Sequence, residues 1–112
     1  NEMITAAHIP IAATGSAFAF KEIGPRRGDF AITAVAAAST KNGILLGVAG
    51  VADVPKTKHF SYKESREPKE LLNAFAWELK GSDDVHATAK YRRNLVRHLG
   101  RDVINEVLNA VS

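Results

Sequence analysis

Cysteine is absent from this chain, which excludes disulfides, thiol catalysis and thiolate-held metal or iron–sulfur centres. No apolar run approaches the roughly 20 residues that a membrane-spanning helix needs. The N-terminus lacks the basic start and the apolar stretch of a signal peptide. We therefore expect a cytoplasmic protein that has no membrane partner.

A strong excess of one charge is also absent. The chain has 15 Lys and Arg against 12 Asp and Glu, which gives a formal net charge of +3, and the two signs are interspersed. This is a weak basic bias, and it gives little support for a nucleic-acid partner. The four histidines share no metal-ligand spacing, so we expect no metal site. They are His8, His59, His86 and His98.

What the chain does contain is typical of one globular domain. Its 112 residues are 46% hydrophobic and 24% charged. That is enough for a single small core but too little for a cofactor domain and a catalytic domain together. We predict one domain over residues 1–112. Because the chain opens on Asn1 instead of Met and is patterned from its third residue, we expect a C-terminal fragment of a longer protein.

Two extended segments are expected near the N-terminus. The first is "MITAAHIP", residues 3–10, and the second is "SAFAFKEIG", residues 16–24. In the second, alternation places Phe18 and Phe20 on one face and Lys21 on the other. We predict that the phenylalanines face the core and that the lysine faces outward over small alanines.

A hairpin and a loop are predicted next. The pair Asn42-Gly43 tolerates the positive φ of a type I′ turn, and it lies between apolar segments at 30–40 and 44–52. We predict that these segments are paired strands. Residues 56–66 mix polar, basic and aromatic residues without a clear helical or strand period, which indicates a loop.

The C-terminal part predicts two helices. The first begins near Pro68, ends near Gly81 and has an apolar stripe of Leu71, Leu72, Phe75, Ala76 and Leu79. Asp83 and Asp84 are candidate N-caps of the second helix. Its apolar residues repeat every four positions, as Tyr91, Leu95, Leu99, Val103 and Val107. Strands followed by helices predict an α+β fold, in which helices cover one face of an antiparallel sheet of three to four strands.

Charged residues of the second helix divide into two groups. Lys90, Arg93, Arg97 and Arg101 share one side. Without interleaved aromatics, this side is favoured as a solvated face over a polyanion-binding face. Arg92 instead points into the apolar arc. A buried guanidinium needs a carboxylate or carbonyl partner, and we predict that Asp29 supplies it. The alternative is that Arg92 extends to solvent along its own stem.

Several motifs together resemble a known family. They are "NEMITAAHIP", "RRGDFAI", "GVAGVADVP" and "DDVHATAKYRRNLVRHLGRDVI", in that order. They resemble the C-terminal domain of the FAD-binding medium subunit of molybdenum hydroxylases, which include carbon monoxide dehydrogenase and the xanthine dehydrogenases. The resemblance covers nearly the whole chain. It departs at residues 56–70, where relatives have a short helix rich in Glu, Ala and Leu.

The resemblance implies a role within a larger enzyme. In such enzymes a molybdopterin centre in the large subunit hydroxylates the substrate, and electrons pass through [2Fe-2S] clusters in the small subunit to FAD in the medium subunit. The glycine-rich loops that hold FAD belong to the preceding N-terminal domain, so this fragment alone is not expected to hold FAD. The resemblance places Lys21 and Ile4 beside the flavin ring, and it gives the chain no catalytic residue.

A second hypothesis belongs to a different class. The chain could be a small basic binding module for nucleic acid or a protein partner, unrelated to redox chemistry. The sequence upstream of Asn1 distinguishes the two hypotheses, because the flavin-subunit hypothesis requires a glycine-rich FAD-binding segment there in the same reading frame.

Overall fold

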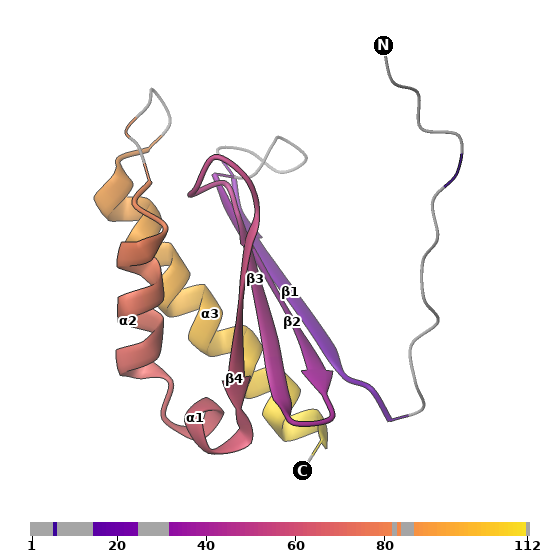
Figure 1. Cartoon of the computed structure of the whole chain (residues 1–112). Coiled ribbons are helices and arrows are strands. Elements are labelled where there is room, and N and C mark those ends of the chain that lie inside the picture. The colour runs from indigo at the N-terminus through magenta and orange to yellow at the C-terminus, as the bar shows by residue number, and fades with distance from the viewer. Residues whose placement is uncertain (1–5, 7–14, 25–31, 82, 84–86, 112) are drawn as a thin grey trace.

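The computed structural model describes residues 6, 15–24, 32–81, 83 and 87–111. Its sheet is antiparallel with the strand order β1-β2-β3-β4. The elements are β1 (Phe18–Ile23), β2 (Thr33–Thr40), β3 (Gly43–Ala49), β4 (Lys56–Ser61), α1 (Tyr62–Arg66), α2 (Lys69–Glu78) and α3 (Ala89–Val111). The helices lie on one side of the sheet (Figure 1). The predicted α+β fold with helices over one face of an antiparallel sheet is confirmed.

The core lies between the sheet and the helices. Strand residues alternate between the two faces of a sheet, so every second residue of β2 and β3 points toward the helices. The largest buried apolar side chains from the sheet are Val35, Ile44, Leu46 and Phe60. Those from the helices include Leu72, Val96, Val103, Ile104 and Val107. Both layers thus contribute branched aliphatic residues to one continuous core.

The β2–β3 hairpin is confirmed, but its predicted turn type is wrong. Thr40 pairs with Gly43, so the loop residues are Lys41 and Asn42. Neither of them has the positive φ that a type I′ turn requires. Gly43 is needed for another reason, because a Cβ there would collide with the carbonyl oxygen of Phe60 on β4.

The prediction of a loop over residues 56–66 is wrong, because this segment forms β4 and α1. A capping box separates the two elements. The Ser61 hydroxyl accepts a hydrogen bond from the Glu64 amide at 3.1 Å, and the Glu64 carboxylate accepts one from the Ser61 amide at 2.8 Å. The latter bond is the main reason why the pKa of Glu64 is lowered. The Ser-x-x-Glu spacing is visible in the sequence and signals a helix start.

The prediction that Phe18 and Phe20 face the core is wrong. Their side chains are 65% and 60% exposed, whereas Ala19 between them is buried under the helices. Helix α3 packs on β1 and β2. Small residues, Ala19 and its cross-strand partner Ala37, are buried on the face that the helices cover. The large rings stand on the other face of the sheet.

Helix α2 follows its prediction, with Pro68 at the N-cap and Leu72, Phe75 and Ala76 buried. The buried stripe of α3 is rotated from the prediction. It comprises Arg92, Val96, Leu99, Gly100, Val103, Ile104 and Val107, while Tyr91 is 45% exposed. A strict four-residue spacing drifts around a helix that has 3.6 residues per turn, so the predicted series cannot stay on one face. In the described residues, no helix has the length and apolar character needed to cross a bilayer.

The start of α3 differs in part from the prediction. Thr88 precedes the helix and its hydroxyl accepts a hydrogen bond from the Tyr91 amide at 3.0 Å, which is an N-cap interaction. Asp83 does contribute, because its carboxylate accepts a hydrogen bond from the Ala89 amide at 2.5 Å. The prediction for Asp84 lies outside the described residues, as do those for Ile4, for Asp29 and for a strand over 3–10.

Thr33 supplies a stability prediction. Its hydroxyl is buried and has no hydrogen-bond partner in the part of the chain that the structure describes. Because an unsatisfied buried hydroxyl is unfavourable, we expect Thr33→Val to raise the free energy of unfolding by about 1 kcal/mol. Thermal unfolding tests this. Thr40→Val is the matched control, since the Thr40 hydroxyl bonds the His59 ring at 3.0 Å. A lower melting temperature for Thr33→Val than for the parent chain would contradict the prediction.

Candidate functional site

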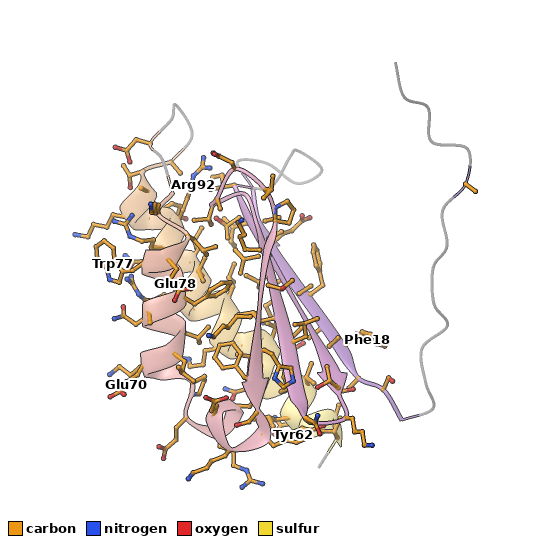
Figure 2. All side chains as sticks on the ribbon, viewed as in Figure 1. Phe18, Tyr62, Glu70, Trp77, Glu78 and Arg92 are labelled. Atoms are coloured by element: carbon orange, nitrogen blue, oxygen red, sulfur yellow. The ribbon has the colours of Figure 1, made fainter. Side chains whose placement is uncertain are left out.

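The described helices leave one face of the sheet uncovered, which we call the open face. Cross-strand partners point to the same side of a sheet, so the register identifies its two central rows. One row consists of Phe18, Ala38, Leu45 and His59. The adjacent row consists of Phe20, Ala36, Gly47 and Thr57. Figure 2 shows Phe18 on the side of the sheet away from the helices.

The open face contains a shallow apolar depression of about 440 Å³. Its floor is formed by the small residues Ala36, Ala38 and Gly47, and Phe18 and Phe20 stand beside it on β1. A Cβ added at Gly47 would have no neighbour nearer than 3.9 Å, so the glycine leaves open space above the floor. The depression can accept a flat apolar group or an apolar protein surface.

Among the described residues, the polar residue Thr57 lines the depression, and His59 lies in the adjacent row of the open face. The Thr40 hydroxyl and the His59 ring Nε2 are 3.0 Å apart, and the Tyr62 hydroxyl donates to the Thr40 carbonyl at 2.9 Å. None of the described residues that line the depression is charged. The sequence predictions missed this surface, although the alternation of alanines in "TAVAAAST" and the glycine in "GILLGVA" signal a floor of small residues.

Lys21 lies on the opposite face of the sheet from the phenylalanines. Its Nζ is 3.6 Å from Glu106 Oε1 and 3.9 Å from Asp102 Oδ2, both on α3. Lys21 shares its face with Ala19 as predicted, but that face is the one covered by helices and not an outward face. The Lys21 side chain is 38% exposed because β1 is at the edge of the sheet. Its predicted contact with a flavin ring stays a prediction.

Two of the basic residues of α3, Arg93 and Arg97, bond to other parts of the chain. The Arg93 guanidinium lies 4.3 Å from the centre of the Trp77 ring and donates to the Lys80 carbonyl at 2.9 Å. Arg97 donates to the Asn73 side chain at 2.8 Å. Both arginines therefore join α3 to α2 and the residues after it, through hydrogen bonds that are exposed to solvent and do not contradict the predicted solvated face.

Arg92 is buried, with 9% of its surface exposed. Its guanidinium donates a hydrogen bond to the Gly50 carbonyl at 2.7 Å. Gly50 has a φ of +86°, and a Cβ there would collide with the carbonyl oxygen of Ile32. Arg92 thus holds the turn after β3 against the start of α3. Its burial excludes the alternative in which the side chain extends to solvent.

The described residues contain no group of three or more His, Asp or Glu side chains that could hold a metal ion. His59 lies on the open face, and His98 is exposed on α3. The candidate site is the open face together with the edge strand β1, a surface whose apolar depression can take an organic group or a protein.

Sequence comparison identifies no relative, since no family model and no curated protein matches the chain. Solved structures do match its fold. Carbon monoxide dehydrogenase from Hydrogenophaga pseudoflava, in a form that lacks the Mo-pyranopterin moiety of its molybdenum cofactor, gives a TM-score of 0.73 at 17% identity. The match covers 93% of this chain and 40% of that chain.

Quinoline 2-oxidoreductase from Pseudomonas putida 86 is similar as well, with a TM-score of 0.59 at 17% identity. This match covers 84% of the present chain and 37% of the other. The chain therefore spans about two fifths of the length of each matched structure. At 17% identity, these two structural matches show a shared fold.

Proposed function

We propose that this chain is the C-terminal domain of the FAD-binding medium subunit of a molybdenum hydroxylase, and that it forms one side of the flavin-binding site there. The observation that carries the proposal is the fold shared over 93% of the chain with part of carbon monoxide dehydrogenase. The match covers only 40% of the carbon monoxide dehydrogenase chain. The proposed domain would therefore function together with the remainder of a longer chain. We propose that the remainder includes the N-terminal FAD-binding domain.

The chemistry of the described residues fits one part of FAD. The open face offers an apolar floor at Ala36 and Gly47 beside the exposed ring of Phe20. Such a surface suits a flat ring or the apolar surface of an adjoining domain. No charged side chain of the described residues lines it, so these residues offer no cation to a pyrophosphate there. We therefore propose that this chain contacts the flavin ring and that the preceding domain binds the rest of the nucleotide.

Lys21 and Ile4 are our proposed ring contacts. Lys21 points to the helix-covered face, opposite the open face, but β1 is an edge strand and the side chain is 38% exposed, so its ammonium group can place positive charge only near a ring that reaches this edge. FAD, when bound, carries the electrons, and its ring accumulates negative charge on reduction. A fixed positive charge at that position stabilises this change. Ile4 would add an apolar contact to the ring.

The proposal also names partners. They are the large subunit with the molybdopterin centre and the small subunit with the [2Fe-2S] clusters, and the assembly would operate in the cytoplasm. The reading frame upstream of Asn1 tests the proposal. A glycine-rich FAD-binding segment there supports it, and an unrelated domain contradicts it. For the alternative of a basic binding module, two of the basic residues on α3, Arg93 and Arg97, already bond within the chain.

We expect the isolated chain to bind FAD weakly or not at all. The open face can contact a ring, but tight binding of a nucleotide cofactor needs most of its surface buried and its polar groups paired. Titration of FAD into the purified chain, followed by flavin fluorescence, tests this. A submicromolar dissociation constant would contradict the expectation, because the residues that bind the nucleotide tightly would then lie within this chain.

A further inference from the structure

We infer that a groove between α2 and α3 binds an acidic segment of a protein partner. The groove has a volume of about 340 Å³, and its lining residues belong to these two helices. Figure 2 shows Glu70, which borders the groove, on the side of α2 away from the sheet. The inference goes beyond the proposed function, because it concerns a surface separate from the open face and needs no flavin.

Close packing of the two helices forms the floor of the groove. Leu72 of α2 lines the groove and is 2% exposed. Gly100 of α3 lies against it, because a Cβ at Gly100 would be 3.0 Å from Leu72 Cδ2. The glycine thus allows α2 to approach α3 at this point. Since both residues are buried, core packing fixes the floor, and the groove is present before a ligand binds.

Arg97 is fixed in the groove by two neutral amides. Its Nε donates to Asn73 Oδ1 at 2.8 Å, and its Nη1 donates to Asn94 Oδ1 at 2.6 Å. An amide oxygen orients a guanidinium without neutralising its charge. A guanidinium has five N–H donors in a planar fork, and these two bonds leave donors for a carboxylate. The arginine is therefore oriented in advance, which lowers the cost of binding an anion.

The groove also has an excess of positive charge. Lys69 and Arg101 line it together with Arg97, and Glu70 is the one acid among its described lining residues. Three cations and one acid give a formal charge of +2 with His98 neutral. In the part of the chain that the structure describes, no carboxylate forms an ion pair with any of the three cations. This uncompensated charge is complementary to an anionic ligand.

The lining favours a protein segment over a nucleic acid. None of the described residues that line the groove is aromatic, so they offer no ring on which a base could stack. Leu72 and the aliphatic stems of Lys69 and Arg101 instead place apolar surface beside the charged groups. A segment with an apolar side chain between carboxylates matches both parts of this surface.

Titration of a peptide into the purified chain tests the inference. The probe is a capped peptide in which one leucine lies between two pairs of glutamates. Binding is followed by the NMR signals of the Asn73 side-chain amide and of the Arg97 Nε–H group. We expect both signals to shift, with a dissociation constant below about 1 mM.

Two variants of equal charge separate the groove from the general surface. In Lys69→Gln/Arg101→Gln, we expect the dissociation constant for the peptide to rise at least tenfold. The matched control is Lys63→Gln/Lys90→Gln, which removes the same charge from exposed residues that do not line the groove. The control should bind the peptide as the parent chain does.

Several outcomes would overturn the inference. The first is a peptide that leaves the Asn73 and Arg97 signals unchanged. Equal weakening in both double variants would mean that binding follows net charge alone. Equal affinity for a peptide with glutamine in place of every glutamate would show that the groove does not recognise carboxylates. Tighter binding of inorganic phosphate or of a single-stranded oligothymidylate would assign the groove to phosphate groups instead of an acidic protein segment.

Discussion

Replacing Arg92 by alanine is expected to lower the free energy of unfolding by about 2 to 4 kcal/mol. The guanidinium donates to the Gly50 carbonyl at 2.7 Å from a position that is 9% exposed. Its loss leaves this carbonyl without its charged donor and creates a cavity under α3. Chemical denaturation of the isolated chain measures the effect, and the melting temperature should fall by roughly 10 °C.

Arg101→Ala is the matched control for this experiment, because Arg101 is exposed on the same helix. We expect its unfolding free energy to stay within about 0.5 kcal/mol of the parent value. If Arg92→Ala is no less stable than Arg101→Ala, the interaction with Gly50 contributes nothing to the fold. The proposed pair with Asp29 would then have no energetic support either.

Replacing Phe18 and Phe20 by serine is expected to weaken FAD binding by the full-length subunit at least tenfold. The rings are 65% and 60% exposed in this chain, and each would bury apolar surface against the flavin or the adjoining domain. Burying a phenylalanine contributes about 1.5–3 kcal/mol, and a tenfold change in affinity corresponds to about 1.4 kcal/mol. The dissociation constant for FAD is the quantity to measure.

The same double variant should leave the isolated chain folded, because neither ring belongs to the core. Its melting temperature should stay close to that of the parent chain. Trp77→Ser is the matched control, since Trp77 is another aromatic residue with 58% exposure but lies on α2. Equal FAD affinity for Phe18→Ser/Phe20→Ser and Trp77→Ser would show that the open face takes no part in flavin binding.

Much of the fold could be predicted from local sequence signals. Pro68 and the apolar stripe of α2 indicated a helix, and Asn42-Gly43 between two apolar segments indicated the hairpin. These signals depend on neighbouring residues only, so they appear in the sequence. The strand β4 was missed because it is an edge strand: Lys56 and Thr57 are exposed and only Phe60 is fully buried, which hides the alternation of a strand.

The site was harder to predict, because it depends on which face of each element the helices cover. Alternation in "AFAFKEI" separates Phe20 from Lys21 but does not say which of them faces the core. The packing of α3 on β1 decides this in favour of Ala19, and it leaves the rings on the open face. The ion pairs of Lys21 with Asp102 and Glu106 join residues more than 80 positions apart, and only the folded chain brings them together.

The most direct test of the proposed function is the flavin content of the full-length subunit to which we propose that this chain belongs. The purified protein should show the absorption spectrum of oxidised flavin and release a stoichiometric amount of FAD on denaturation. A folded, full-length protein that carries no flavin and does not take up added FAD would contradict the claim that this chain is a domain of a flavin subunit.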